Sequence, residues 1–256
     1  MLLLTGLLLI IFAVGYVTMA RYLDKPGGLY AFVRAGLGSR MGDGASYVAG
    51  AVYALIAAGS IGAFAVFANQ AARNLLGVDI PWTVWAAIAI IGMAVLGYRN
   101  VDLGAKVLGI IISLEIGMLL LVSLAIIVRG GAHGLTLEPL APSNMFGSSM
   151  GTMFAISLAA FAGFEATVMY ADEVTDRTKT IRRATYGSVA LLAIMYAFAA
   201  WAIVMAYGTN EAVAAANADP INLFFSAASQ YLGPWASVVM QVLVVSSWFA
   251  TILAFH

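Results

Sequence analysis

The chain has 256 residues, of which 63% are hydrophobic and 9% are charged. A soluble domain is about 45–50% apolar, so this composition excludes a chain that is mainly surrounded by water. The formal net charge is zero and cysteine is absent. These two facts exclude a general electrostatic attraction to nucleic acid, and they exclude disulfides, thiolate metal sites and cysteine nucleophiles.

The chain contains seven apolar stretches. About 20 apolar residues suffice for a helix that crosses a bilayer. We expect membrane spans at residues 2–20, 45–69, 81–98, 104–128, 147–171, 184–207 and 235–256. Polar or Gly/Pro-rich connectors separate these stretches. The predicted fold class is therefore an all-α polytopic membrane protein, with a single transmembrane domain of about seven spans over residues 1–256.

The basic residues predict the orientation of these spans. Cytoplasmic loops carry an excess of Lys and Arg, and one set of alternate connectors holds ten of the 12 basic residues. We expect this set to face the cytoplasm, whereas the other set contains only Arg73 and Arg129. The members of the first set are Arg21, Lys25, Arg34, Arg40, Arg99, Lys106, Arg177, Lys179, Arg182 and Arg183.

The stretch at 104–128 places Glu115 in the middle of an apolar run. A charged side chain at membrane depth costs about 2.5–3.5 kcal/mol on insertion scales, so it needs a partner, a proton or a water-filled cavity. Two interpretations are open. Glu115 is either paired structurally, with a hydroxyl or with a lysine from a span outside this sequence, or it carries a proton during a functional cycle.

The stretch at 147–171 is interrupted by Ala159-Ala160-Phe161-Ala162-Gly163-Phe164-Glu165. A helix-weakening glycine lies between two phenylalanines and is followed by a carboxylate. One interpretation is a helix that stops near Ala159 and restarts near Phe164, as in transporters whose discontinuous spans hold the substrate. The other is an unbroken helix in which Gly163 allows close packing against a neighbouring helix.

A broken helix would offer both halves of a binding site. The carbonyls of Ala159 to Ala162 would lose their hydrogen-bond partners and would suit an ammonium group. The restarted helix would point its positive N-terminal end at the same place, which suits a carboxylate. A zwitterionic α-amino acid carries both groups. The candidate substrate-binding residues are Ala159, Ala160, Phe161, Ala162, Gly163 and Phe164, the two phenylalanines shielding the site from water.

Glu165 also has two open interpretations. It is either a proton-coupling carboxylate that takes up and releases a proton during the cycle, or it is bonded permanently to a Ser, Tyr or backbone donor and holds two helices in register. Glu165 and Glu115 are thus the two proton-coupling candidates.

The C-terminal part offers weaker signals. Residues 209–233 form either a lid over an outer vestibule or an interfacial linker. Ser246, Ser247 and Thr251 in the last stretch would suit sodium as oxygen ligands, but such hydroxyls commonly bond to their own helix. Neither His133 nor His256 has a partner spaced for metal binding. We therefore expect no metal and no cofactor.

Three motifs together resemble amino-acid permeases of the amino acid–polyamine–organocation superfamily. The first is Phe161-Ala162-Gly163-Phe164-Glu165, followed by Ala171-Asp172-Glu173 and the loop from Asp176 to Ala184. The second is Pro26-Gly27-Gly28-Leu29-Tyr30, similar to the end of the family's second span. The third is Ser247-Trp248-Phe249-Ala250 to Phe255-His256, similar to its eighth span.

The resemblance implies a fold of five-plus-five inverted repeats with a discontinuous sixth span. On this basis the chain corresponds to spans two to eight of ten to twelve, truncated at both ends, and lacks the first span that supplies half of the family's substrate site. Two departures stand out. Arg177 and Arg182 replace the usual loop prolines, and Glu115 aligns best where one branch of the family carries a buried lysine in place of a coupling cation.

The resulting functional prediction is a secondary active transporter that moves amino acids or related amines by alternating access, coupled to protons rather than to sodium. Its location would be the plasma (inner) membrane, and its partners would be the substrate, the proton and the lipid bilayer, without nucleic acid. A membrane-embedded enzyme needs clustered catalytic side chains, which the spans lack, so we expect no enzyme activity. A seven-span receptor or structural membrane protein is the alternative.

Overall fold

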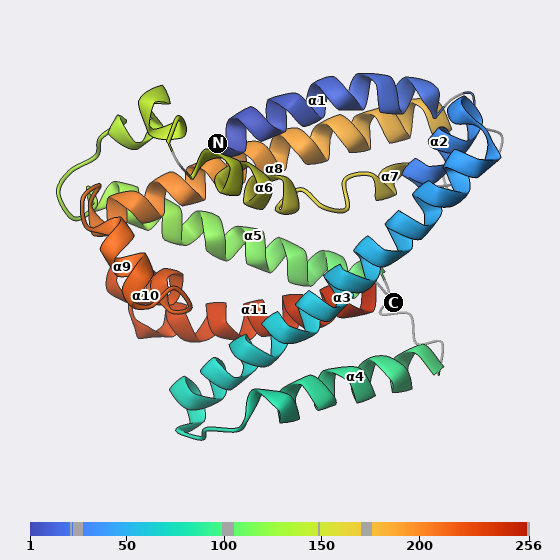
Figure 1. Ribbon diagram of the computed structural model, residues 1–256. Coiled ribbons are helices and arrows are strands. Elements are labelled where there is room, and N and C mark those ends of the chain that lie inside the picture. Colours follow the sequence, from blue (N-terminus) through green and yellow to red (C-terminus); the bar gives the residue numbers. More distant parts are fainter. Residues whose placement is uncertain (21, 23–27, 99–104, 148, 170–175, 255–256) are drawn as a thin grey trace. The chain divides into compact units, whose positions relative to one another are not determined.

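The computed structural model describes residues 1–20, 22, 28–98, 105–147, 149–169 and 176–254. Within these ranges it contains helices and turns but no strand, so the protein is an all-α polytopic membrane protein, as predicted (Figure 1). Some residues used in the sequence analysis lie outside the described part. They are Arg21, Lys25, Pro26, Gly27, Arg99, Ala171, Asp172, Glu173, Phe255 and His256.

Five helices of the described part are long and apolar enough to cross a membrane. They are α1 (Leu2–Met19), α3 (Ser39–Leu76), α5 (Ala105–Val128), α8 (Arg177–Tyr207) and α11 (Pro234–Ala254). Two of the seven expected spans contain shorter apolar helices, α4 (Trp82–Tyr98) and α6 (Met150–Ala159). The short length of α6 has a local cause, because its span is interrupted where the sequence suggested.

Two helices extend well beyond their apolar stretches. The helix α3 begins at Ser39 instead of residue 45, and α8 begins at Arg177 instead of residue 184. A hydropathy window detects only the part of a helix that suits lipid, whereas backbone hydrogen bonding continues through charged turns. At about 1.5 Å per residue, the 38 residues of α3 extend about 57 Å, well beyond a hydrocarbon core of about 30 Å.

The chain divides into two compact units. The first comprises Met1–Ala51 and Leu137–Trp201. It contains α1, the first part of α3 and most of α8. Its shorter helices are α2 (Leu29–Leu37), the 3-10 helices η1 (Glu138–Leu140) and η2 (Pro142–Met145), α6 and α7 (Ala166–Met169). The helices α1 and α8 approach so closely that a Cβ added to Gly6 would lie 2.5 Å from the Cβ of Ala193. Small residues at such crossings are typical of helix packing in membranes.

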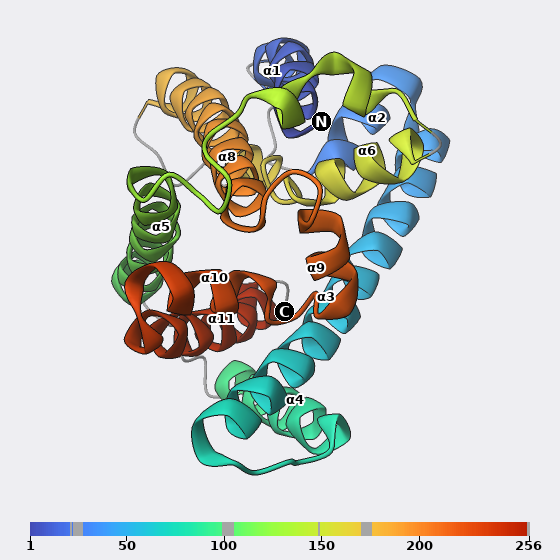
Figure 2. The same cartoon turned by 90° about the vertical axis from the view of Figure 1, so that its left-hand side faces the viewer.

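The second unit comprises Val52–Thr136 and Ala202–His256. It contains α4, α5, α9 (Ala212–Ala218), α10 (Leu223–Leu232) and α11, with the remaining parts of α3 and α8. Here α11 packs against α10, α5 and α4, and Figure 2 shows α10 lying along α11. The buried core includes Phe64, Ala68, Ala89 and Ile252. The segment at 209–233 contains the helices α9 and α10.

Candidate functional site

The break in the span at 147–171 is the first candidate site, and it lies within the first unit. The helix α6 ends at Ala159, six residues form turns, and α7 begins at Ala166. Gly163 has a φ of +97°, a conformation that costs other L-residues about 1–2 kcal/mol. The prediction of a broken helix is therefore confirmed, its end at Ala159 is correct, and its restart comes at Ala166, two residues after Phe164.

The turns leave two carbonyl groups without helical partners. The carbonyl oxygen of Ala159 accepts a hydrogen bond from Ala162 N–H at 3.1 Å, and that of Phe161 accepts one from Phe164 N–H at 3.3 Å. Among the residues that the structure describes, no backbone amide bonds to the carbonyl of Ala160 or Ala162. Turn bonds thus satisfy two of the four carbonyls that the sequence analysis expected to be free.

Glu165 bonds to the backbone of the break. Its Oε2 accepts a hydrogen bond from Gly163 N–H at 3.0 Å, and its own carbonyl oxygen accepts one from the Tyr16 hydroxyl at 2.7 Å. The first contact is with a backbone donor of the turn itself. The second joins α1 to the start of α7, a role that the sequence analysis did not assign to Tyr16.

The two phenylalanines of the motif lie in different surroundings. Phe161 is 1% exposed and packs with Leu9 of α1 and with Val189 and Ala193 of α8. The ring of Phe164 lies 6.0 Å from that of Phe12 and 6.3 Å from that of Tyr16. Both side chains therefore fix the break against α1, and Phe161 also fixes it against α8, while Ala159, Ala160 and Ala162 are exposed.

A pair of hydroxyls anchors the far end of the break. Thr167 Oγ1 lies 2.7 Å from Thr185 Oγ1 of α8, and it also donates to the carbonyl of Phe164 at 3.1 Å. Thr185 is fully buried. The turn is thus held on both sides, by Tyr16 and by Thr185, which favours one defined conformation over a flexible interruption.

Glu115 belongs to a second candidate site, which lies within the second unit. Ser247 Oγ of α11 donates a hydrogen bond to Glu115 Oε2 of α5 at 3.0 Å. Of the three hydroxyls noted in the last span, Ser246 and Thr251 bond to carbonyls of their own helix at 2.9 Å, as expected. Ser247 differs because it reaches another helix. Its role could not be read from the sequence, since it depends on how α11 is rotated against α5.

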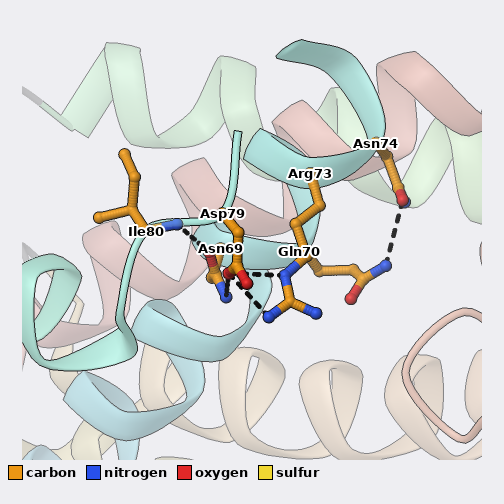
Figure 3. A network of polar contacts seen from close by, with 6 residues as sticks. All are labelled: Asn69, Gln70, Arg73, Asn74, Asp79 and Ile80. Atoms are coloured by element: carbon orange, nitrogen blue, oxygen red, sulfur yellow. Dashed lines mark hydrogen bonds and ion pairs between the residues drawn. The ribbon is translucent and has the colours of Figure 1, made fainter. Parts of the chain in front are cut away.

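A polar network lies at the end of α3 in the same unit (Figure 3). Arg73 Nη2 lies 2.7 Å from Asp79 Oδ1, and Asn69 Nδ2 donates to the same oxygen at 3.2 Å. These hydrogen bonds, chiefly the one from Arg73, hold the pKa of Asp79 below its ordinary value of 3.8. Asn69 Oδ1 also accepts a hydrogen bond from Ile80 N–H at 3.1 Å. The network therefore fixes the short connection between α3 and α4.

Asn74 extends this network to α11 and to the start of α10. Its Nδ2 donates to Gln241 Oε1 at 3.0 Å and, more weakly, to Asn222 Oδ1 at 3.4 Å, while its Oδ1 accepts from Gln70 at 3.1 Å. Gln241 is 4% exposed and also bonds to Ser237 Oγ at 3.1 Å. The sequence analysis did not identify Asn74, an amide in the connector after the stretch at 45–69, or Gln241, an amide within the stretch at 235–256.

The segment at 209–233 is held unevenly. The hydroxyl of Tyr231 in α10 donates to the carbonyl of Ala206 at 3.1 Å, and that of Tyr207 in α8 donates to the carbonyl of Leu223 at 2.5 Å. In contrast, α9 has no buried residue within its bounds. Beside its start, the exposed side chains of His133 and Glu211 approach to 3.6 Å. The part anchored to the second unit is therefore α10.

No group of three or more metal-ligating side chains occurs in the described part of the chain. The comparison with protein families found a match to the family described as amino acid permease, over residues 1–255. No curated protein and no solved structure matched the chain.

Proposed function

Because the chain belongs to the amino acid permease family, we propose that it is a secondary active transporter of amino acids or related amines, coupled to protons and working by alternating access. Membership of this family supports a transporter. It speaks against the receptor or structural protein that the number of spans alone left open. The observation that carries the specific proposal is the break between α6 and α7, with its left-handed glycine and with carbonyls released from helical hydrogen bonding.

The break supplies groups for both ends of an amino acid. The carbonyl oxygens of Ala160 and Ala162 are acceptors for the substrate's ammonium group. A backbone amide of the same turn already binds a carboxylate, because Gly163 N–H donates to Glu165. We expect the substrate's carboxylate to use such a backbone donor of the turn. Ala159, Phe161 and Phe164 complete the proposed site by holding the turn in place.

Proton coupling requires a carboxylate that changes its protonation state within the membrane-spanning region. Glu165 and Glu115 are the two candidates. Glu165 accepts a hydrogen bond from the backbone of the break, and Glu115 accepts one from Ser247 of α11. The proposed location is the plasma (inner) membrane of the cell, with the lipid bilayer as the surrounding solvent. This proposal assigns transport without catalysis to the chain.

The test is uptake by the purified full-length protein in liposomes. Labelled small amino acids and amines should accumulate when the external pH is lower than the internal pH, and a protonophore should abolish the accumulation. A saturable downhill flux without any response to the pH gradient would retain transport but reject proton coupling. Absence of saturable uptake for every amino acid and amine, in a protein shown to be folded, would reject the proposed function.

A further inference from the structure

Glu115 and Ser247 form a contact that suits a carboxyl group in either protonation state. A serine hydroxyl is one donor and also an acceptor. It donates to an ionised carboxylate, and by rotating it accepts from a protonated one. Because Ser247 Oγ lies 3.0 Å from Glu115 Oε2, this exchange needs only a turn of the hydroxyl, without movement of either helix.

The contact of Glu165 lacks this property. Gly163 N–H is a donor only, and it bonds to Glu165 Oε2 at 3.0 Å. A hydrogen bond from a fixed donor favours the charged form of a carboxyl group. The contact between Ser247 and Glu115 can therefore follow a change of protonation without a new partner, and the contact between Gly163 N–H and Glu165 cannot.

The lack of charged side chains on the helices packed against α5 also supports Glu115 as the group that takes up a proton. The helices that pack most closely against α5 are α10 and α11, and neither carries Asp, Glu, Lys, Arg or His within its bounds. Tyr231 of α10 is the titratable side chain of that pair, and its hydroxyl donates to Ala206. On α5 itself, Lys106 lies nine residues away, or about 13 Å along the helix. A carboxyl group that meets no cation from α10 or α11 is stabilised by taking up a proton.

We propose that Ser247 is the positioning residue of the proton site and that Glu115 is the carboxyl group that carries the proton. This inference rests on the proposed function, because it assigns a residue to the coupling step of transport. Protonation forms the O–H bond on Glu115 and neutralises its carboxylate, and deprotonation returns the proton to water. Ser247 keeps its own proton in both states.

Uptake by the full-length protein in liposomes, measured against external pH, tests the assignment. Glu115→Gln should abolish the pH dependence. Ser247→Ala removes the hydrogen bond to both forms of Glu115. Because the bond to the charged form is the stronger one, the midpoint of the profile should rise, by about 0.5 to 1 pH unit. Ser247→Thr retains a hydroxyl and should restore the midpoint. Ser246→Ala is the matched control, because this neighbouring hydroxyl bonds to Val242 of its own helix.

A second measurement keeps the inference falsifiable if a variant loses uptake. Infrared difference spectra between acidic and neutral pH should contain the C=O band of a protonated carboxyl group, absent from Glu115→Gln and present in Glu165→Gln. An unchanged band in Glu115→Gln, or a Ser247→Ala midpoint equal to that of the native protein, would overturn the proposal. Loss of the pH response in Glu165→Gln alone would assign the proton to the break. None of these results affects the separate test of saturable uptake.

Discussion

Gly163 determines the geometry of the break, and its effect can be separated from that of side-chain bulk. An added Cβ at Gly163 or at Gly151 of α6 would meet no atom within 4 Å, but only Gly163 has a positive φ. Gly163→Ala should therefore cost about 1–2 kcal/mol through backbone strain. If the turn must keep its native conformation to bind substrate, affinity should fall about 5- to 30-fold.

Gly151→Ala is the control for this comparison, since alanine is favoured in a helix. Substrate affinity of both variants can be measured by isothermal titration or by competition with a labelled amino acid. Equal affinities in the two variants would show that the left-handed turn does not contribute to the site.

Individual residues also show what the sequence could predict about the site. The position of the break followed from Gly163 and Glu165, because a glycine and a charged side chain weaken an apolar helix locally. The partners of the break were not predictable in the same way. Tyr16 and Thr185 lie far from it in sequence, and their contacts depend on how α1 and α8 are rotated about their axes. The same reason applies to Ser247 and Glu115.

At the scale of helices, Asn74 joins α3 to α11 by a hydrogen bond to the buried amide of Gln241. Asn74→Leu would remove the donor to Gln241, which is 4% exposed. A buried polar group that loses its partner costs about 1–3 kcal/mol, so the melting temperature of the purified protein should fall clearly. Gln70→Ala is the control, because Gln70 donates one hydrogen bond to the same Asn74 and leaves the bond to Gln241 intact. Similar losses in both variants would contradict a central role for Asn74.

Asp79 at the end of the same network should make stability depend on pH. Its pKa is lowered, chiefly by the hydrogen bond from Arg73, so the folded state favours the ionised form. The stabilisation is therefore complete above the ordinary pKa of 3.8 and is lost as pH falls through the lower pKa of the folded state. The pair is exposed, so its contribution should be small and reduced by salt.

Thermal unfolding of Asp79→Asn and of the native protein measures this contribution. The difference between them should be the same at pH 5 and pH 7, and it should shrink below about pH 3.8. A difference that grows on acidification would mean that Asp79 is stabilised by protonation, opposite to the direction expected here.

The helices themselves were largely predictable, and the exceptions have a physical pattern. Apolar stretches located every long helix, because the membrane demands about 20 apolar residues in a row. The apolar stretches did not predict the ends of a helix that continues into polar turns, as at Ser39 in α3 and at Arg177 in α8. The helix α2 was not predicted either, since its nine residues lie within a connector and make no complete span.

For the whole molecule, the remaining prediction is the orientation across the membrane. The excess of basic residues places Arg34 and Arg182 in the cytoplasm and Arg73 and His133 outside. Because the chain contains no cysteine, single substitutions can be labelled without background. A membrane-impermeant maleimide applied to intact cells should label His133→Cys, whose native side chain is 66% exposed, but not Arg182→Cys. Permeabilised cells should label both positions, which controls for accessibility. Labelling of position 182 in intact cells would reverse the orientation, and the network around Arg73 would then face the cytoplasm.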